Sequence, residues 1–176
     1  MKAVLISIRP KWCEEIASGE KTIEVRKSAP KETPFKAYIY ETYDKKYDDI
    51  GICYGNGKCF EHGCKKVIGE FICDKVDEYI FSHYEAEYRV THIEQEAMCL
   101  NHPDLIRYGK GKPLYGLHIT ALKIYDKPKA LSCFYKQCPK NTTCSTCDWF
   151  HVDWHTFGEC SNTITRPPKN YIYIEE

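Results

Sequence analysis

The sequence lacks an excess of charge of either sign, because 25 lysine and arginine residues are matched by 25 aspartate and glutamate residues. A neutral chain has no overall attraction to nucleic acid, so any anion site must be a local patch of cations. The sequence also lacks an apolar run approaching the ~18 residues that a membrane span needs. The apolar stretch over residues 1–8 is too short for the apolar region of a secretion signal, and it is followed by Arg9-Pro10-Lys11. We therefore expect a cytoplasmic protein without membrane association.

The chain also lacks internal repeats and low-complexity tracts, and its 176 residues fit one domain that buries roughly 70% of its unfolded surface. It contains 14 Tyr, 7 Phe and 3 Trp, which argues against wholesale disorder. Cysteine, by contrast, is abundant. An odd number, 11, in a chain without a recognisable secretion signal favours free thiols or metal sites over disulfides.

The pattern of apolar residues predicts many short strands with a few short helices. Pro10 suits a first helical position and Gly19 a left-handed helix cap. Thr91 with Glu94 has the spacing of a capping box. The expected fold class is α+β, a small mixed β-barrel with helical decoration. We expect strands over residues 1–8, 21–27, 36–42, 66–74, 76–81, 115–125 and 171–174, and helices over 10–18, 91–99 and 103–108.

A cluster of polar residues follows the first predicted helix, in the pattern Gly19-x-Lys21-x-x-Glu24-x-Arg26. Lys21 follows a helix C-terminus, where the helix dipole favours a cation. Glu24 and Arg26 are two residues apart in a predicted strand, so their side chains share a face. Together the three can line a pocket that holds a phosphate or contacts a base edge. The alternative is a structural Glu24–Arg26 ion pair with a solvated Lys21.

A second basic element lies at residues 108–116, where glycine, lysine and tyrosine alternate. Glycine allows backbone to approach a phosphate, lysine neutralises it and tyrosine can stack on a base. Lys110 and Lys112 are therefore candidate contacts. The spacing is not that of a Walker loop, and an ordinary solvated turn is the alternative.

The motif at residues 19–26, with the segments around it, resembles the ASCH family, named for homology to an activating signal cointegrator. The supporting segments are residues 7–12, 67–71 and 115–119, and the end of the chain is similar to short phage- or prophage-type members in its Arg166-Pro167-Pro168 and aromatic strand. The resemblance implies a PUA-like β-barrel with a helix after its first strand. It predicts a barrel over residues 1–128, a Cys-rich lobe over 129–165 and a closing strand over 166–176.

ASCH domains are thought to bind nucleic acid in a cleft, so the resemblance implies binding of RNA or another single-stranded nucleic acid. In this hypothesis Lys21 and Arg26 contact phosphate or a base acceptor, while Glu24 orients Arg26 or accepts from a base amine. The expected site residues are Lys21, Glu24 and Arg26, with Trp12, Arg9, Lys110 and Lys112 at the rim.

Two other functions remain open. Some ASCH relatives hydrolyse N4-acetylcytidine, a modified nucleoside, and others are described as ribonucleases. In the amidohydrolases a lysine assists a threonine nucleophile; Lys21 matches that lysine, but Glu24 stands at the nucleophile's position. If the protein is an enzyme, Lys21 and Glu24 are the expected acid/base pair, with a further carboxylate from Glu70, Glu94 or Glu96. The third possibility is a protein-interaction module that uses the aromatic Cys-rich lobe.

The cysteines near the end of the chain have spacing typical of a metal site. A C-x-x-C pair can place two thiolates on one tetrahedral ion, and two flanking cysteines complete a closed structural zinc site. The expected ligands are Cys138, Cys144, Cys147 and Cys160, with Cys133, His151 and His155 as substitutes and reduced thiols as the alternative. A second group, Cys53, Cys59, His62 and Cys64, is spaced more like a hairpin tip than a metal site.

Overall fold

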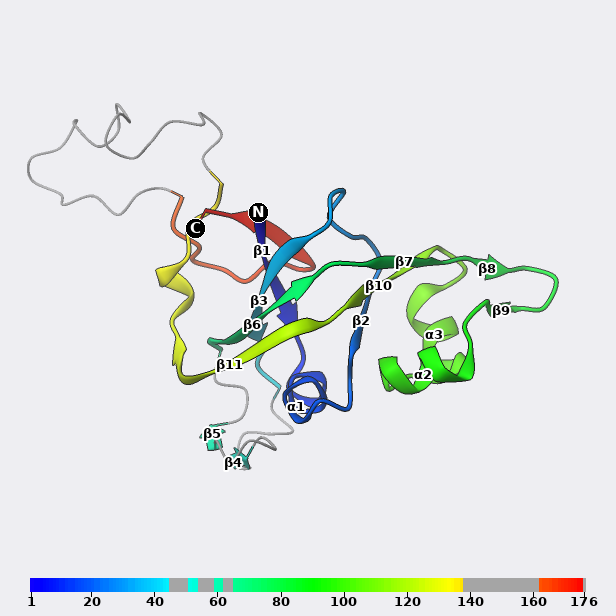
Figure 1. Cartoon of the computed structure of the whole chain (residues 1–176), viewed down its shortest axis with the longest axis horizontal. Coiled ribbons are helices and arrows are strands. Elements are labelled where there is room, and N and C mark those ends of the chain that lie inside the picture. Colours follow the sequence, from blue (N-terminus) through cyan, green and yellow to red (C-terminus); the bar gives the residue numbers. More distant parts are fainter. Residues whose placement is uncertain (45–50, 54–58, 62–64, 138–161, 176) are drawn as a thin grey trace, which may run out of the picture.

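The computed structural model describes residues 1–44, 51–53, 59–61, 65–137 and 162–175. Its largest unit is a five-stranded sheet in the order β11-β6-β3-β1-β12. Strand β1 is parallel to β3 and antiparallel to β12, which brings the last strand of the chain beside the first (Figure 1). The five strands are β1 (Lys2–Ile8), β3 (Phe35–Glu41), β6 (Val67–Cys73), β11 (Thr120–Lys129) and β12 (Tyr171–Ile174).

A second, three-stranded sheet has the order β2-β10-β7 and carries two helices on one side. Two small hairpins, β4–β5 and β8–β9, extend from the body of the fold. The strands of the second sheet are β2 (Ile23–Arg26), β7 (Val76–Tyr79) and β10 (Leu114–His118). The hairpin strands are β4 (Gly51–Cys53), β5 (Cys59–Glu61), β8 (Phe81–Ser82) and β9 (Glu87–Tyr88). The helices are α1 (Pro10–Ser18), α2 (His92–Met98), α3 (His102–Gly109) and the 3-10 turn η2 (Leu131–Cys133).

Three apolar clusters hold these layers together. The first packs α1 onto the large sheet through Cys13 and Ile16, against residues such as Ile6 and Phe71. The second covers the other face of that sheet. The third joins the small sheet to α2 and α3 through Tyr88, Met98, Leu105 and Leu114. Between these layers lies a cavity that is lined from both the β1–α1 side and the β2–α3 side.

The sequence predicts most of these elements, and the local signals act as expected. Pro10 begins α1, Gly19 ends it with φ +86°, and the Thr91–Glu94 capping box is formed at α2. The α+β class is confirmed. The single strand expected over residues 115–125 is wrong, because the chain bends there: β10 belongs to the small sheet and β11 to the large one. Through this bend the described strands form two joined sheets rather than one closed ladder.

Two local expectations also differ from the structure. The alternation of apolar and polar residues over 21–27 predicts a half-buried strand, but all four residues of β2 are buried, because its polar side chains form the floor of a cavity. The glycine after the helix expected over 103–108 predicts that Gly109 ends it, but Gly109 is the last residue of α3 and Lys110 is the left-handed cap, with φ +54°. A side chain cannot replace Gly109 without a shift in packing, since a Cβ there would lie 1.7 Å from the hydroxyl of Tyr88.

The predicted Cys-rich lobe is described only at its edges. Phe134 and Ile164 pack into the outer cluster of the large sheet, and Tyr135 bridges to Thr163. The two described ends of this excursion therefore lie next to each other on the sheet. Within the described part of the chain, no helix is long and apolar enough to cross a membrane.

Candidate functional site

The three charged residues of the motif are buried together at the end of β1. The exposed fractions of Lys21, Glu24 and Arg26 are 2%, 6% and 7%. Their position follows from local structure, because Gly19 turns the chain at the end of α1 and the Lys21 amide donates to the carbonyl oxygen of Glu15 at 2.9 Å. The solvated Lys21 of the alternative interpretation is therefore wrong.

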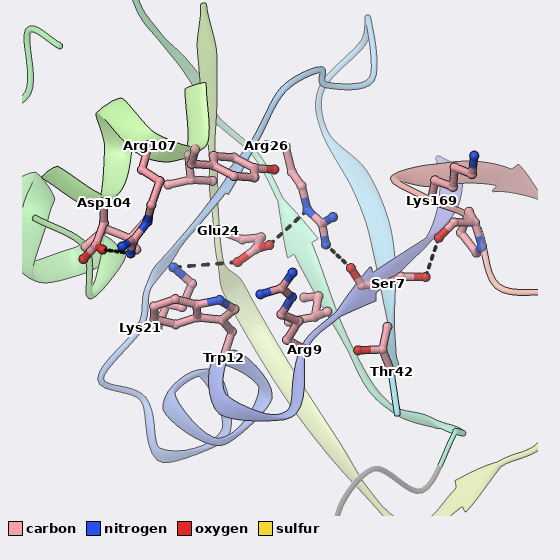
Figure 2. A pocket seen from close by; sticks show the side chains of 15 residues that line it. Ser7, Arg9, Trp12, Lys21, Glu24, Arg26, Thr42, Asp104, Arg107 and Lys169 are labelled. Atoms are coloured by element: carbon pink, nitrogen blue, oxygen red, sulfur yellow. Dashed lines mark hydrogen bonds and ion pairs between the residues drawn. The ribbon is translucent and has the colours of Figure 1, made fainter. Parts of the chain in front are cut away.

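Glu24 is the central member of this buried group (Figure 2). Its Oε1 lies 3.0 Å from Arg26 Nε, and its Oε2 lies 3.7 Å from Lys21 Nζ. One carboxylate thus lies between two cations. Because unpaired charges are very costly to bury, Glu24 is what permits both cations to remain there.

The two cations also reach outward to backbone on opposite sides. Arg26 Nη2 donates to the carbonyl oxygen of Ser7 at 2.5 Å, at the end of β1. Lys21 Nζ donates to the carbonyl oxygen of Met98, where the dipole of α2 favours a cation. The group therefore links the large sheet to the small sheet and its helices. Although Arg26 Nε is close to Glu24, it makes no aligned hydrogen bond to the described residues, so the guanidinium retains hydrogen-bonding capacity.

Burial lowers the pKa of Lys21 below its ordinary value, and attraction to Glu24 opposes that shift. The ammonium group lies 5.0 Å from the centre of the Trp12 ring, within cation–π range. Lys21 is thus a partly desolvated ammonium held by a carboxylate, a carbonyl oxygen and an aromatic ring.

Above this group lies a cavity of about 570 Å³. This volume falls within the range of about 300–1,000 Å³ that is usual for small-molecule sites. Its walls come from both halves of the fold: Ser7, Arg9, Trp12 and Thr42 from one side, and Leu100, Asp104, Arg107 and Tyr108 from the other. Pro168 and Lys169, just before the last strand, complete the lining.

The cavity is strongly positive although the chain is neutral. Five cationic side chains line it, against the two carboxylates of Glu24 and Asp104. Lys21 and Arg26 are buried, whereas the other three cations, Arg9, Arg107 and Lys169, are exposed. The rim cations are therefore the ones that solvent, or a ligand, can reach.

The rim cations differ in how they are engaged. Arg107 pairs with Asp104 on α3 at 2.5 Å, with its side chain 82% exposed. Arg9 and Lys169 are in no ion pair within the described ranges. In Figure 2 the Arg9 side chain extends from the end of β1 toward the middle of the cavity. A bound anion could therefore pair with Arg9 and Lys169, which have no competing carboxylate, and with Arg107, whose ion pair is exposed to solvent.

The structure brings together five of the seven residues predicted for the site: Arg9, Trp12, Lys21, Glu24 and Arg26. It does not bring Lys110 and Lys112 to the cavity lining; both are exposed in the turn after α3. Sequence reasoning missed Arg107 and Lys169 as lining residues, whereas Tyr108 lies in the segment 108–116, whose tyrosines were expected to stack on a base. The only signal for Lys169 is its place in the Arg166-Pro167-Pro168 segment, and nothing in the sequence marks Arg107.

The carboxylates considered for catalysis lie elsewhere. Glu70 accepts a hydrogen bond from the Tyr125 hydroxyl, and Glu94 serves the α2 cap. Glu96 pairs with His92 on the exposed side of α2. None of the three lines the cavity, so Glu24 and Asp104 are the carboxylates available there.

The proposed zinc ligands Cys138, Cys144, Cys147 and Cys160 lie outside the described residues, as do His151, His155, His62 and Cys64. Cys133, the described substitute, is free and exposed in η2. Cys53 and Cys59 are register partners across the β4–β5 hairpin, in agreement with the hairpin that the sequence predicts for this segment. Across the described ranges, no group of three or more His, Cys, Asp or Glu side chains is placed to hold a metal ion.

Comparisons with known proteins find similarity in structure alone. No protein-family model matches the sequence, and no curated protein matches it. The crystal structure of ASCH from Zymomonas mobilis is similar with a TM-score of 0.51 and 16% identity, over 99% of this chain and 89% of that chain. A serine-to-alanine mutant protein of the same ASCH, also from Zymomonas mobilis, is similar with a TM-score of 0.50 and 15% identity over the same shares. The chain therefore has the fold of an ASCH domain, as its motif predicts.

Proposed function

We propose that this protein binds single-stranded nucleic acid, RNA in the first instance, and takes one nucleotide of the strand into the cavity. The observation that carries the proposal is the concentration of positive charge around a nucleotide-sized cavity in a chain of zero net charge. Phosphate contacts are the main source of nucleic-acid affinity, and they require accessible cations. Arg9, Arg107 and Lys169 meet that requirement.

The two depths of the cavity suit different parts of a nucleotide. The rim cations would hold phosphate, which fixes register without reading sequence. The buried floor would contact the base: Lys21 and Arg26 can donate to a base carbonyl, and Glu24 holds both in place. Trp12 and Tyr108 supply aromatic side chains in the walls, on which a base can stack. Of the two contacts that the sequence-based hypothesis allows for Lys21 and Arg26, phosphate or a base acceptor, this proposal keeps the base acceptor and assigns phosphate to the rim.

The test is a fluorescence titration of short single-stranded RNA at several salt concentrations, with Arg9→Ala and Lys169→Ala beside the parent protein. Both side chains are exposed, so their loss leaves the buried group intact. Each variant should bind more weakly and lower the slope of log K against log salt by about one. Lys127→Ala, which removes an exposed lysine from β11, is the matched control and should bind like the parent. Unchanged affinity and slope in both rim variants would overturn the proposal.

A second candidate function is hydrolysis of a modified nucleoside. The observation that favours it is the lowered pKa of Lys21 beside Glu24, since such a pair can move a proton to or from bound water. The test is incubation with N4-acetylcytidine and detection of cytidine. Turnover that disappears in Lys21→Met and persists in Lys127→Met would favour hydrolysis over nucleic-acid binding as the function of the cavity. The absence of turnover in the parent protein would remove this candidate.

A further inference from the structure

We propose that the turn at Lys110-Gly111-Lys112 and the β8–β9 hairpin form a second contact surface for the same RNA strand, outside the cavity. We call it the hairpin surface and define it by Lys110, Lys112, His83 and Tyr84. This inference rests on the proposed function. It accounts for two lysines that the sequence marks as contacts and that the cavity does not use.

The turn is held in one shape by several contacts. Lys110 and Gly111 both have positive φ, +54° and +77°. The Lys112 amide donates to the carbonyl oxygen of Gly109 at 3.2 Å, and the Tyr88 hydroxyl donates to the carbonyl oxygen of Lys112 at 2.7 Å. Because Tyr88 is fully buried, the turn is fixed to the core of the small sheet. Two lysines are thus presented on a rigid support.

The same turn lies against the aromatic hairpin. A Cβ at Gly111 would lie 3.9 Å from the Phe81 ring and 4.0 Å from the His83 ring. Phe81 packs edge-on between His83 and Tyr88, at centroid distances of 5.2 and 5.1 Å. Tyr84 follows at the tip of the hairpin and is 100% exposed. The exposed ring of His83 thus lies against the turn that carries the two lysines, and Tyr84 extends the aromatic surface toward the tip. Single-stranded nucleic acid is bound by such a combination, with bases stacked on rings and phosphates on cations.

The charges on this surface are available to a ligand. Lys110 and Lys112 are exposed, and neither is in an ion pair within the described ranges. The hairpin also carries two carboxylates: Glu85 lies 3.9 Å from Arg89, and Glu87 lies 3.8 Å from His102, which is a cation only when it is protonated. With histidine neutral, Lys110, Lys112 and Arg89 outnumber Glu85 and Glu87, so the turn and the hairpin together carry a net positive charge that is complementary to a phosphate backbone.

Helix α3 connects this surface to the cavity. Arg107 and Tyr108 line the cavity, and Lys110 caps the same helix three residues after Arg107, a rise of about 4.5 Å along the axis. Figure 1 shows the turn after α3 beside β8, with the β8–β9 hairpin projecting from the body of the fold. A strand with one nucleotide in the cavity would lead its neighbouring phosphates toward Lys110. A strand of several nucleotides is therefore the occupant that fits both surfaces.

The experiment compares two probes, random-sequence dinucleotides and random-sequence octamers of single-stranded RNA, at one low salt concentration. The parent protein should bind the octamer more tightly than the dinucleotide, because only the octamer can reach the hairpin. Lys110→Ala with Lys112→Ala, and separately Tyr84→Ala, should each weaken octamer binding about tenfold and leave dinucleotide binding unchanged. Lys127→Ala should change neither. All of these side chains are exposed, so the variants should fold.

The outcomes separate the two proposals. Octamer binding that survives both hairpin variants but is lost in Arg9→Ala overturns the hairpin surface and keeps the cavity. Octamer binding that is lost in the hairpin variants but survives Arg9→Ala and Lys169→Ala keeps the hairpin and overturns the cavity. A parent protein that binds neither probe overturns both.

Discussion

Lys21 donates a hydrogen bond from its ammonium group to the carbonyl oxygen of Met98, the last residue of α2. The motif lysine is therefore a helix cap as well as part of the cavity floor. Through Glu24 it is connected to Arg26, and Arg26 in turn is bonded to β1. Substitution of Lys21 should consequently affect the stability of the fold together with any ligand binding.

Replacement of Lys21 by methionine should destabilise the protein by on the order of 3 kcal/mol, because it removes one partner from a buried ion pair. The change can be measured by urea unfolding followed by circular dichroism. Lys127→Met is the control, since substitutions at exposed positions usually fall within about 0.5 kcal/mol. Equal stability of the two variants would mean that Lys21 is not bound into the core as described.

The stability of the parent protein relative to Lys21→Met should rise with pH in the alkaline range, and this comparison cancels the opposing effect of groups such as Cys73 and Cys99, whose pKa values burial raises. Burial lowers the pKa of Lys21 in the folded state, so between that pKa and the ordinary value of 10.5 the unfolded chain binds more protons than the folded one. The contribution of Lys21 to the free energy of unfolding therefore increases with pH. Because the parent is expected to be the more stable of the two, the urea midpoints of the parent and Lys21→Met should diverge as the pH is raised. A constant difference would contradict the lowered pKa.

Replacement of Gly109 by alanine should cost about 1–3 kcal/mol, because the added Cβ would overlap the hydroxyl of buried Tyr88 and the packing must shift. Gly19→Ala is a matched comparison. Gly19 has φ +86° with open space around it, so its substitution costs backbone strain of only about 1 kcal/mol. Thermal unfolding should show the larger loss for Gly109→Ala. The reverse order would argue against the packing of α3 on Tyr88.

The cysteine spacing leads us to propose one zinc ion per chain, held by Cys138, Cys144, Cys147 and Cys160. Metal analysis of protein purified without chelator should find it, and Cys144→Ser should lose it. Cys133→Ser should retain it, which would separate the proposed ligand set from one that includes Cys133. The absence of both zinc and iron in the parent protein would exclude the site.

Local signals in the sequence predicted the parts of the fold that depend on neighbouring residues. Pro10 and Gly19 mark the limits of α1, and Thr91 with Glu94 marks the start of α2. Each of these signals acts within a few residues, so it is visible without the rest of the chain. Gly109 was misjudged because the reason for it, the Tyr88 ring, lies 21 positions away in sequence and belongs to tertiary packing.

In the candidate site, too, the residues that lie close together in sequence could be predicted, and those that tertiary packing brings together could not. Lys21, Glu24 and Arg26 fall within six residues, so their proximity could be predicted. Arg107 and Lys169 reach the same cavity from α3 and from the segment before β12. Their proximity depends on tertiary packing, so no local sequence pattern could predict it. Lys110 and Lys112 were placed at the cavity because their composition suits phosphate. The structure instead places their turn against the β8–β9 hairpin.

The most direct test of the central claim locates the RNA on the protein. Single-stranded RNA that carries 4-thiouridine is bound, cross-linked by light, and the attached peptides are identified by mass spectrometry. The account predicts cross-links within residues 7–12 and 104–108, on the two walls of the cavity, and their loss in Arg9→Ala. Cross-links confined to other parts of the chain, and unaffected by Arg9→Ala, would contradict it.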